Sequence, residues 1–308
     1  MKKAVLLWLI LSFPVLAADS STVLMITFRG ITAAERGFMN HFRKKDLPVR
    51  FVLRDCNNDK ARLPAFISEI PGLKPDLIYA FGTTVAVGLA GAPAAGDIPL
   101  VCNIIADPAG AGLVKTGRDL TGVCHLVPVA VQVRAIRSML PFRTLGVIYN
   151  PLEKNSVLMV EQLEKCRDSC SFKVIKIAAA PPADPAPAVE RLKAAGAELL
   201  YLPSDSYIIS RAGGIAARAA ALKLPVFSAT EEPILKSGAL FGVVSRYYNA
   251  GQFAGHKAEQ ILFHGMKARD IPFETLSRFS FIINMKTARQ IGFIPPILTL
   301  KFAEVVTE

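Results

Sequence analysis

The chain alternates between short, continuous apolar runs and longer segments whose apolar residues recur every three or four positions. The runs Thr22–Thr27, Val49–Leu53 and Ile98–Asn103 predict strands. The segments between them, beginning with Thr32–Lys45, have the spacing of helices that pack by one face. Continuous Val, Ile and Leu runs are typical of parallel strands that are covered on both faces.

A second series of the same kind begins near Pro128. It predicts strands at Thr144–Tyr149 and Val226–Ala229, and helices at Lys154–Asp168 and Tyr207–Leu222. Proline precedes several predicted strands, where a helix has to end. Two such series predict an α/β protein with two doubly wound, Rossmann-like lobes.

The first residues of the chain predict export. Lys2 and Lys3 precede an apolar run of about 13 residues, Ala4–Leu16, and Ala17 supplies the small residue of a cleavage site. The run is shorter than the roughly 20 residues of a membrane-spanning helix. We therefore expect a signal peptide over residues 1–18 and a periplasmic protein. Because no cysteine follows the cleavage region, we expect no lipid anchor.

Composition limits the function classes. Of the 308 residues, 52% are hydrophobic and 20% charged, which is incompatible with disorder. The formal charge of +11 permits contact with anions or nucleic acid. Export, together with the absence of a basic block or a helix-turn-helix pattern, argues against nucleic acid as a partner.

Motifs of catalysis are missing from the sequence. It has neither the G-x-x-x-x-G-K-[ST] motif of nucleotide P-loops nor a G-x-S-x-G elbow or an H-E-x-x-H pair. His256 and His264 are two helical turns apart, too far to share one metal ion. The sequence thus predicts a protein that is not an enzyme and that carries neither a cofactor nor a metal.

Parallel sheets of this kind bind ligands outside the carboxyl ends of their strands. That rule selects Phe28-Arg29-Gly30, Gly82-Thr83-Thr84, Asp107-Pro108, Asn150-Pro151, Ser204-Asp205-Ser206, Thr230-Glu231 and Ser245-Arg246. Small hydroxyl residues at helix starts expose backbone N–H groups that suit a carboxylate or a phosphate. The alternative is that Thr83, Asn155, Ser156 and Ser206 only cap their helices.

The five cysteines offer two disulfide candidates, Cys102–Cys124 and, if a helix ends between them, Cys166–Cys170. Cys102 ends a predicted strand and Cys124 lies in the following extended segment. A bridge between them would close a loop of roughly 23 residues and contribute about 3 kcal/mol in the chain-entropy model. The alternative is that the cysteines are buried small apolar residues.

Several stretches resemble the bacterial ABC-transporter substrate-binding proteins of the kind that includes tryptophan-binding members. They are Asp76–Thr84 (DLIYAFGTT), Ala106–Val114 (ADPAGAGLV), Val147–Val157 (VIYNPLEKNSV) and Phe281–Gly292 (FIINMKTARQIG). The resemblance runs from about Asp76 to the C-terminus. It implies a type I periplasmic-binding-protein fold, in which two lobes joined by three crossovers hold a ligand between them.

The resemblance also implies where the lobes divide. The N-terminal lobe would comprise residues 19–124 and 246–275, and the C-terminal lobe residues 125–245 and 276–308. The three crossovers would then fall near Cys124, Ser245 and Thr275. The predicted helix Tyr247–His264 would return to the first lobe.

Ligand-binding residues are implied position by position. Thr83 and Thr84 match a Gly-Thr turn, Asn155 and Ser156 match a turn that would hold an anion, and Asp205 matches a polar position after a strand. Glu231 matches the second residue of the family's Asp-Glu pair, and Thr230 replaces the first. Arg246 stands where the family often has Asp. Because two partners of a ligand ammonium are thus missing, we expect an anionic ligand without an ammonium group, bound by Arg246 and Arg29.

The resemblance implies a receptor that closes around a small polar or anionic metabolite, amino-acid-like or a carboxylate. Closure is stabilised by whatever affinity the ligand has for the closed form over the open one. We expect a monomer that delivers its ligand to a membrane ABC permease with its ATPase. The alternative is a receptor that presents its ligand to a membrane signalling protein.

Overall fold

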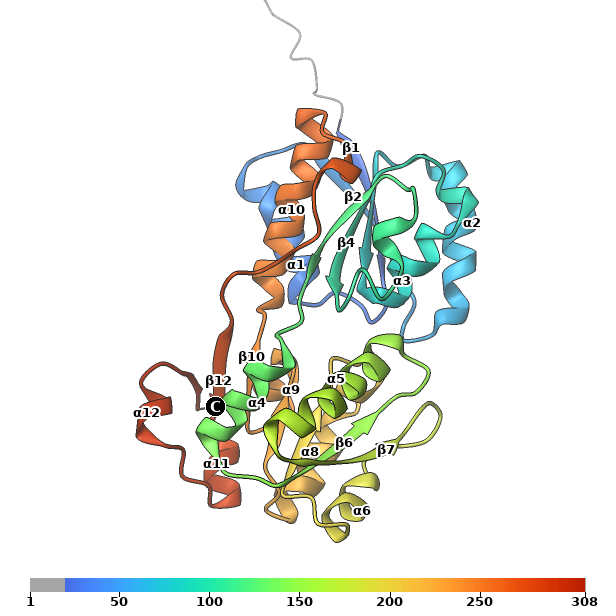
Figure 1. Ribbon diagram of the computed structural model, residues 1–308. Helices are drawn as coiled ribbons and strands as arrows, with labels where there is room; N and C mark the ends of the chain where they lie inside the picture. Colours follow the sequence, from blue (N-terminus) through green and yellow to red (C-terminus); the bar gives the residue numbers. More distant parts are fainter. Residues whose placement is uncertain (1–19, 308) are drawn as a thin grey trace, which may run out of the picture.

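The computed structural model describes residues 20–307, which form two α/β lobes stacked one above the other (Figure 1). The predicted signal peptide, residues 1–18, lies outside the described residues. Within the described part, no helix combines the length and the apolar character needed to cross a membrane.

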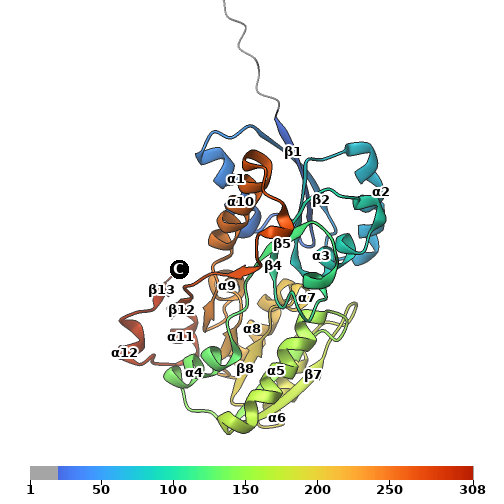
Figure 2. The ribbon, with the colours of Figure 1, turned by 45° about the horizontal axis from the view of Figure 1, so that its top comes forward.

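The upper lobe is built on a six-stranded sheet in the order β11-β5-β4-β3-β1-β2, with every pair of neighbours parallel. Helices α1 and α10 cover one side of this sheet, while α2 and α3 cover the other (Figure 2). Its elements are β1 (Ser21–Thr27), α1 (Ala33–Lys44), β2 (Val49–Asp55), α2 (Leu63–Leu73), β3 (Leu77–Phe81), α3 (Gly82–Ala90), β4 (Leu100–Ile105), β5 (Leu120–Cys124), α10 (Tyr247–His264) and β11 (Glu274–Thr275).

The lower lobe is built on a seven-stranded sheet in the order β13-β12-β10-β9-β8-β6-β7. Its neighbours are parallel except β10 and β12, which run antiparallel. Its elements are α4 (Val129–Met139), β6 (Thr144–Tyr149), α5 (Lys154–Cys170), β7 (Lys173–Ala178), α6 (Ala188–Ala194), β8 (Leu199–Leu202), α7 (Ser206–Ser210), α8 (Ala212–Ala221), β9 (Val226–Ser228), α9 (Glu231–Lys236), β10 (Phe241–Val244), β12 (Ser280–Asn284), α11 (Met285–Ile291), α12 (Ile297–Leu300) and β13 (Glu304–Val306).

The predicted alternation of strands and helices is confirmed, and the two-lobed α/β class with it. The chain passes between the two sheets three times: after β5, after β10 and after β11. The C-terminal strands β12 and β13 both belong to the lower sheet. Both lobes therefore consist of segments that are far apart in the sequence.

One predicted helix is divided in the structure. The segment predicted as a single helix over Tyr207–Leu222 forms α7 and α8, which meet at Arg211 with φ −107° and ψ 3°. The Arg211 N–H donates to the carbonyl of Ile208, three residues back, and this tighter turn interrupts the helical ladder. Apolar spacing continues through the break, so periodicity did not reveal it.

The predicted disulfide between Cys102 and Cys124 is absent, because both are free thiols. They lie in neighbouring strands, but Cys102 pairs with Gly122, while Cys124 pairs with Ile105 beyond a bulge. Burial raises the pKa of the Cys124 thiol to about 11, so it forms almost no thiolate, the reactive species, at neutral pH. Both cysteines are buried small apolar residues, as the alternative interpretation held.

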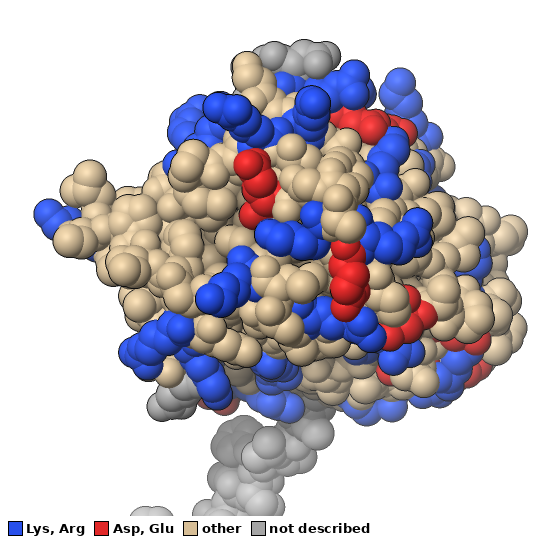
Figure 3. All heavy atoms as spheres, turned by 90° about the horizontal axis from the view of Figure 1, so that it is seen from below, with Lys and Arg blue, Asp and Glu red and all other residues tan. Residues whose placement is uncertain are grey.

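Surface charge accords with the basic composition. On the face seen from below, lysine and arginine side chains are scattered between uncharged residues, and acidic side chains lie among them (Figure 3). This face carries no single continuous basic stripe of the kind that follows a nucleic-acid backbone.

Candidate ligand-binding site

A cavity lies between the two lobes, at the carboxyl ends of strands from both sheets. The space between its walls, counting all volume that is not occupied by atoms and including open solvent, is about 350 Å³. Its lining combines five large apolar side chains with charged and hydrogen-bonding groups: Phe28, Arg29, Phe81, Gly82, Thr83, Thr84, Ile104, His125, Glu153, Asn155, Ser204, Asp205, Ser206, Ile209 and Tyr247. An apolar wall with a few polar groups is the usual make-up of a small-molecule site.

Two unusual backbone conformations shape the wall of the upper lobe. Gly82 has φ +80°, which lets β3 turn directly into α3 and places Thr83 in the first turn of that helix. Ile104 has φ 59°, and the bulge between β4 and β5 lies at the same point. A β-branched residue in this conformation is strained, and such strain gathers at functional sites.

Arg29 extends from the end of β1 into the cleft and reaches the other lobe. Its guanidinium carbon lies 5.6 Å from the centre of the Phe81 ring and 5.8 Å from that of Tyr247. One terminal nitrogen, Nη1, is 3.2 Å from a carboxylate oxygen of Glu232 in α9. The Arg29 side chain is only 7% exposed, and its Nε is buried with no hydrogen-bond partner among residues 20–307. Arg29 is therefore a buried cation with a spare donor.

The lower lobe contributes two buried carboxylates, Glu153 and Asp205. Asp205 caps α7 by accepting from the Ile208 N–H at 2.7 Å, while its other oxygen has no partner in the described part of the chain. Glu153 accepts from the Ser206 N–H at 3.0 Å and from the Asn155 side-chain amide at 2.9 Å. No lysine or arginine of the described residues forms an ion pair with either carboxylate. Burial and the neighbouring Glu153 charge raise the pKa of Asp205 well above its usual range.

His125 joins the lobes deeper in the cleft. It follows β5, where the chain leaves the upper sheet, and its Nε2 lies 2.6 Å from Oγ of Ser204 in the lower lobe. Its ring packs edge-on against Tyr247, with 5.7 Å between the ring centres. Burial lowers the pKa of His125 to about 4, so the ring is neutral at neutral pH. We infer that His125 supplies a polar contact without adding charge.

Five predicted site residues line this cavity: Arg29, Thr83, Thr84, Asn155 and Asp205. The first three belong to the upper lobe and the other two to the lower lobe. The fold thus brings together residues that the strand-end rule and the family resemblance selected separately.

Four predicted site residues do not line the cavity, and the first two are buried behind it. Ser156 is fully buried, and its Oγ accepts from the Asn150 N–H at 3.0 Å. Thr230 is 1% exposed. The first turn of α5 was expected to hold a ligand anion, but the Asn155 amide there donates to Glu153 instead. The chain's own carboxylate therefore occupies that position.

The other two, Glu231 and Arg246, form an ion pair. Glu231 lines a second cavity, which adjoins the first and shares Arg29, Ile209 and Tyr247 with it. Nε of Arg246 is 2.9 Å from Glu231, and its Nη1 is 3.2 Å from Glu304 of β13. Glu231 also accepts from the Tyr247 N–H at 3.1 Å. Two carboxylates of the protein therefore already pair with Arg246, and this placement gives no support to the expectation that Arg246 binds an anionic ligand.

Sequence reasoning missed Glu153, His125 and Tyr247. Glu153 stands in the loop between two residues that had been selected, while His125 and Tyr247 directly follow the first two crossovers. The position of His125 and Tyr247 next to a crossover would have revealed them, because the chain passes the cleft at each crossover. The apolar residues Phe81, Ile104 and Ile209 carried no signal that distinguishes them from core residues.

Two lobes with a polar, aromatic-walled cavity between them define a two-lobed solute-binding protein. The model of the family described as ABC transporter substrate binding protein matches residues 24–306, and the chain belongs to this family. Its fold is that of the type I periplasmic binding proteins. Proteins of this family bind ligands without converting them, so the chain is a binding protein and not an enzyme.

A curated relative and two solved structures are similar over most of the chain. The tyrosine-binding protein of Clostridioides difficile (strain R20291) is 27% identical over 274 residues, which are 86% of this chain and 78% of that protein. A conserved domain protein from Vibrio cholerae O1 biovar El Tor is 25% identical, with a TM-score of 0.87, over 94% of this chain and 100% of the other. An ABC domain from Streptococcus pneumoniae in complex with L-Trp is 24% identical, with a TM-score of 0.82, over 92% of this chain and 100% of the other.

Proposed function

We propose that the protein is an exported receptor that captures a zwitterionic amino acid with an aromatic or other large apolar side chain. The two lobes close on the amino acid, and the closed form delivers it to an ABC importer in the membrane that faces the periplasm. The single observation that carries this proposal is the pairing, in one cavity, of a buried arginine with a spare donor and a buried aspartate with a free oxygen.

The charges of the cavity suit the two ends of an amino acid. Among the described residues no lysine or arginine forms an ion pair with Asp205, and a ligand ammonium would supply the missing cation. Nε of Arg29 offers a charge-assisted hydrogen bond to a ligand carboxylate. Each group is costly to bury alone, so a ligand that satisfies both stabilises the closed form strongly.

The walls of the cavity suit a large apolar side chain. Phe28, Phe81, Ile104, Ile209 and Tyr247 surround the polar groups. Burial of an aromatic ring against them removes apolar surface from water and adds ring–ring contacts. The tyrosine-binding relative agrees with this choice.

This proposal replaces the expectation of an anionic ligand that lacks an ammonium group. That expectation rested on Thr230 and Arg246, at two positions where the family often has acidic residues. Neither residue lines the cavity, whereas the carboxyl groups of Glu153 and Asp205 do. The two substitutions therefore leave an ammonium site intact.

Calorimetry with matched ligands tests the proposal. L-Phenylalanine, L-tyrosine and L-tryptophan are compared with 3-phenylpropionate, which lacks the ammonium, and with phenethylamine, which lacks the carboxylate. We expect saturable binding of at least one amino acid and losses of about 100-fold or more for both analogues, because each leaves a buried charge unpaired. Equal affinity for 3-phenylpropionate would contradict the proposed ammonium site.

Native mass spectrometry of the freshly purified protein identifies the ligand taken up in cells. We expect a retained mass equal to that of an amino acid. Scattering with and without this ligand then reports closure, and an unchanged radius of gyration would contradict the proposed mechanism.

A further inference from the structure

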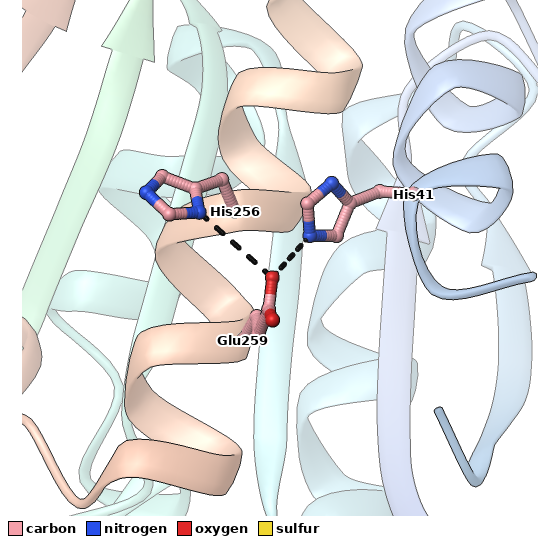
Figure 4. A group of neighbouring side chains, drawn as sticks. All are labelled: His41, His256 and Glu259. Carbon is pink, nitrogen blue, oxygen red and sulfur yellow. Dashed lines mark hydrogen bonds and ion pairs between the residues drawn. The ribbon is translucent and has the colours of Figure 1, made fainter. Parts of the chain in front are cut away.

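Three of the four histidines of the chain gather around one carboxylate on the outer side of the upper lobe. That carboxylate is Glu259 in the middle of α10, and His41 reaches it from α1 (Figure 4). Nε2 of His41 is 2.6 Å from Oε2 of Glu259, and Nδ1 of His256 is 3.8 Å from the same oxygen. Nε2 of His264 lies 3.8 Å from the other oxygen, Oε1.

The two helices are held close together at this point by glycines. A side chain at Gly251 would collide with the backbone of Ala34, and one at Gly255 would collide with His41. His41 thus has little freedom to move away from α10. The side chains of His41 and Glu259 are 11% and 10% exposed, whereas His256 is 51% exposed. The cluster is a half-open site with two largely buried members and one exposed member.

The geometry is close to that of a bound transition metal. One nitrogen of each of the two histidines and one oxygen of Glu259 lie within 4.8 Å of one another. Ligand atoms around tetrahedral Zn²⁺ are about 3.4 Å apart when each bond is about 2.1 Å. Nε2 of His41 and Oε2 of Glu259 are only 2.6 Å apart, so a bound ion requires this pair to separate as well as the exposed His256 ring to turn inward. A water molecule can complete the coordination on the exposed side.

Lys45 is the competitor for the carboxylate. Its Nζ lies 2.9 Å from Oε1 and 2.7 Å from Oε2 of Glu259. The Lys45 side chain is 47% exposed, so it can turn out into solvent when a dication displaces it. The Lys45 ammonium is then hydrated by water, and the dication replaces it as the positive partner of Glu259.

We propose that His41, His256 and Glu259 form a binding site for a divalent transition metal of the Zn²⁺ class, which fastens α1 to α10. Imidazole and carboxylate donors together suit Zn²⁺ and its neighbours rather than Mg²⁺ or Ca²⁺. The sequence concealed the site because His41 and His256 are far apart in the chain. The site is distinct from the cavity between the lobes and does not depend on which solute binds there.

Zinc titration of the exported chain, freed of metal by chelator and prepared without a histidine tag, tests this proposal. We expect one Zn²⁺ per chain by calorimetry and a higher melting temperature with zinc. Cobalt(II) is expected to give the strong visible absorption of a low-coordinate site. The exposed His256→Gln variant folds without difficulty and should lose about tenfold or more in zinc affinity.

Three further variants sharpen the test. Glu259→Gln should abolish binding, whereas Glu161→Gln, the same chemical change on the exposed face of α5, should leave it unchanged. Lys45→Gln should tighten binding, because it removes the competing cation, and a purely structural ion pair would give no such gain. Absence of saturable binding, or zinc affinity that survives both His256→Gln and Glu259→Gln, would overturn the proposal.

Discussion

Buried carboxylates at two places in the lower lobe differ in whether a cation of the protein neutralises them. Glu231 is 6% exposed and is compensated by Arg246, which also pairs with Glu304. Asp205 is fully buried beside Glu153, and neither has an ion-pair partner among the described residues. The first group is complete within the protein, whereas the second lacks a cation.

This difference distinguishes a structural charge from a functional one. Burial of a carboxylate without a partner costs free energy, and no ion pair formed on folding offsets that cost. A ligand that brings the missing cation recovers it on binding. The incomplete group is therefore where we place the ligand, although sequence resemblance selected Glu231 and Asp205 alike.

The largest effect is expected from Asp205→Asn. This change keeps the cap of α7, since the amide oxygen still accepts from Ile208, but it removes the charge for the ligand ammonium. We expect a loss of about 100-fold or more in amino-acid affinity, measured by calorimetry.

Glu231→Gln is the matched control, with an expected change in affinity of about threefold or less. The comparison fails if Glu231→Gln weakens binding as strongly as Asp205→Asn does.

A smaller effect, on stability and not on binding, is expected from Arg246→Gln. The variant leaves Glu231 buried without its cation, and we expect a loss of about 1–3 kcal/mol in the free energy of unfolding by urea denaturation. Ligand affinity should stay near that of the parent protein.

The double variant Glu231→Gln/Arg246→Gln should recover part of that stability, because the uncompensated charge is then gone. If Arg246→Gln instead abolished binding at unchanged stability, the anionic-ligand interpretation would regain its basis.

A third effect is expected in the pH dependence of the stability of the ligand-free protein. The pKa of Asp205 is raised on folding, so the folded state holds a proton that the unfolded state has released. Stability should therefore fall as pH rises from the ordinary aspartate range toward the raised pKa, by at most about 1.4 kcal/mol per pH unit.

Asp205→Asn should remove this slope. The difference between the two proteins in the pH dependence of unfolding free energy gives the contribution of Asp205 alone. His125, whose pKa is lowered on folding, contributes with the opposite sign in both proteins. A slope that persists in the variant would assign it to another group.

Prediction of the site from the sequence succeeded where local rules apply. Thr83 and Asp205 follow strands, and parallel strands end at a common edge, so their convergence follows from the alternation of elements. The rule could not tell which strand-end residues face the cavity. Thr230 satisfies it and is buried behind the wall, as is Ser156, which the family resemblance selected.

The order of strands and helices, the division into two lobes and the absence of catalytic motifs were determined by the sequence alone, because periodicity and turn residues act over a few positions. Only the tertiary structure decided which charges meet. Arg246 contacts Glu304, Arg29 contacts Glu232 across the cleft, and His41 contacts Glu259 between two helices. These pairs join residues that are distant in the chain, and their energies depend on separation and burial, which no local pattern records.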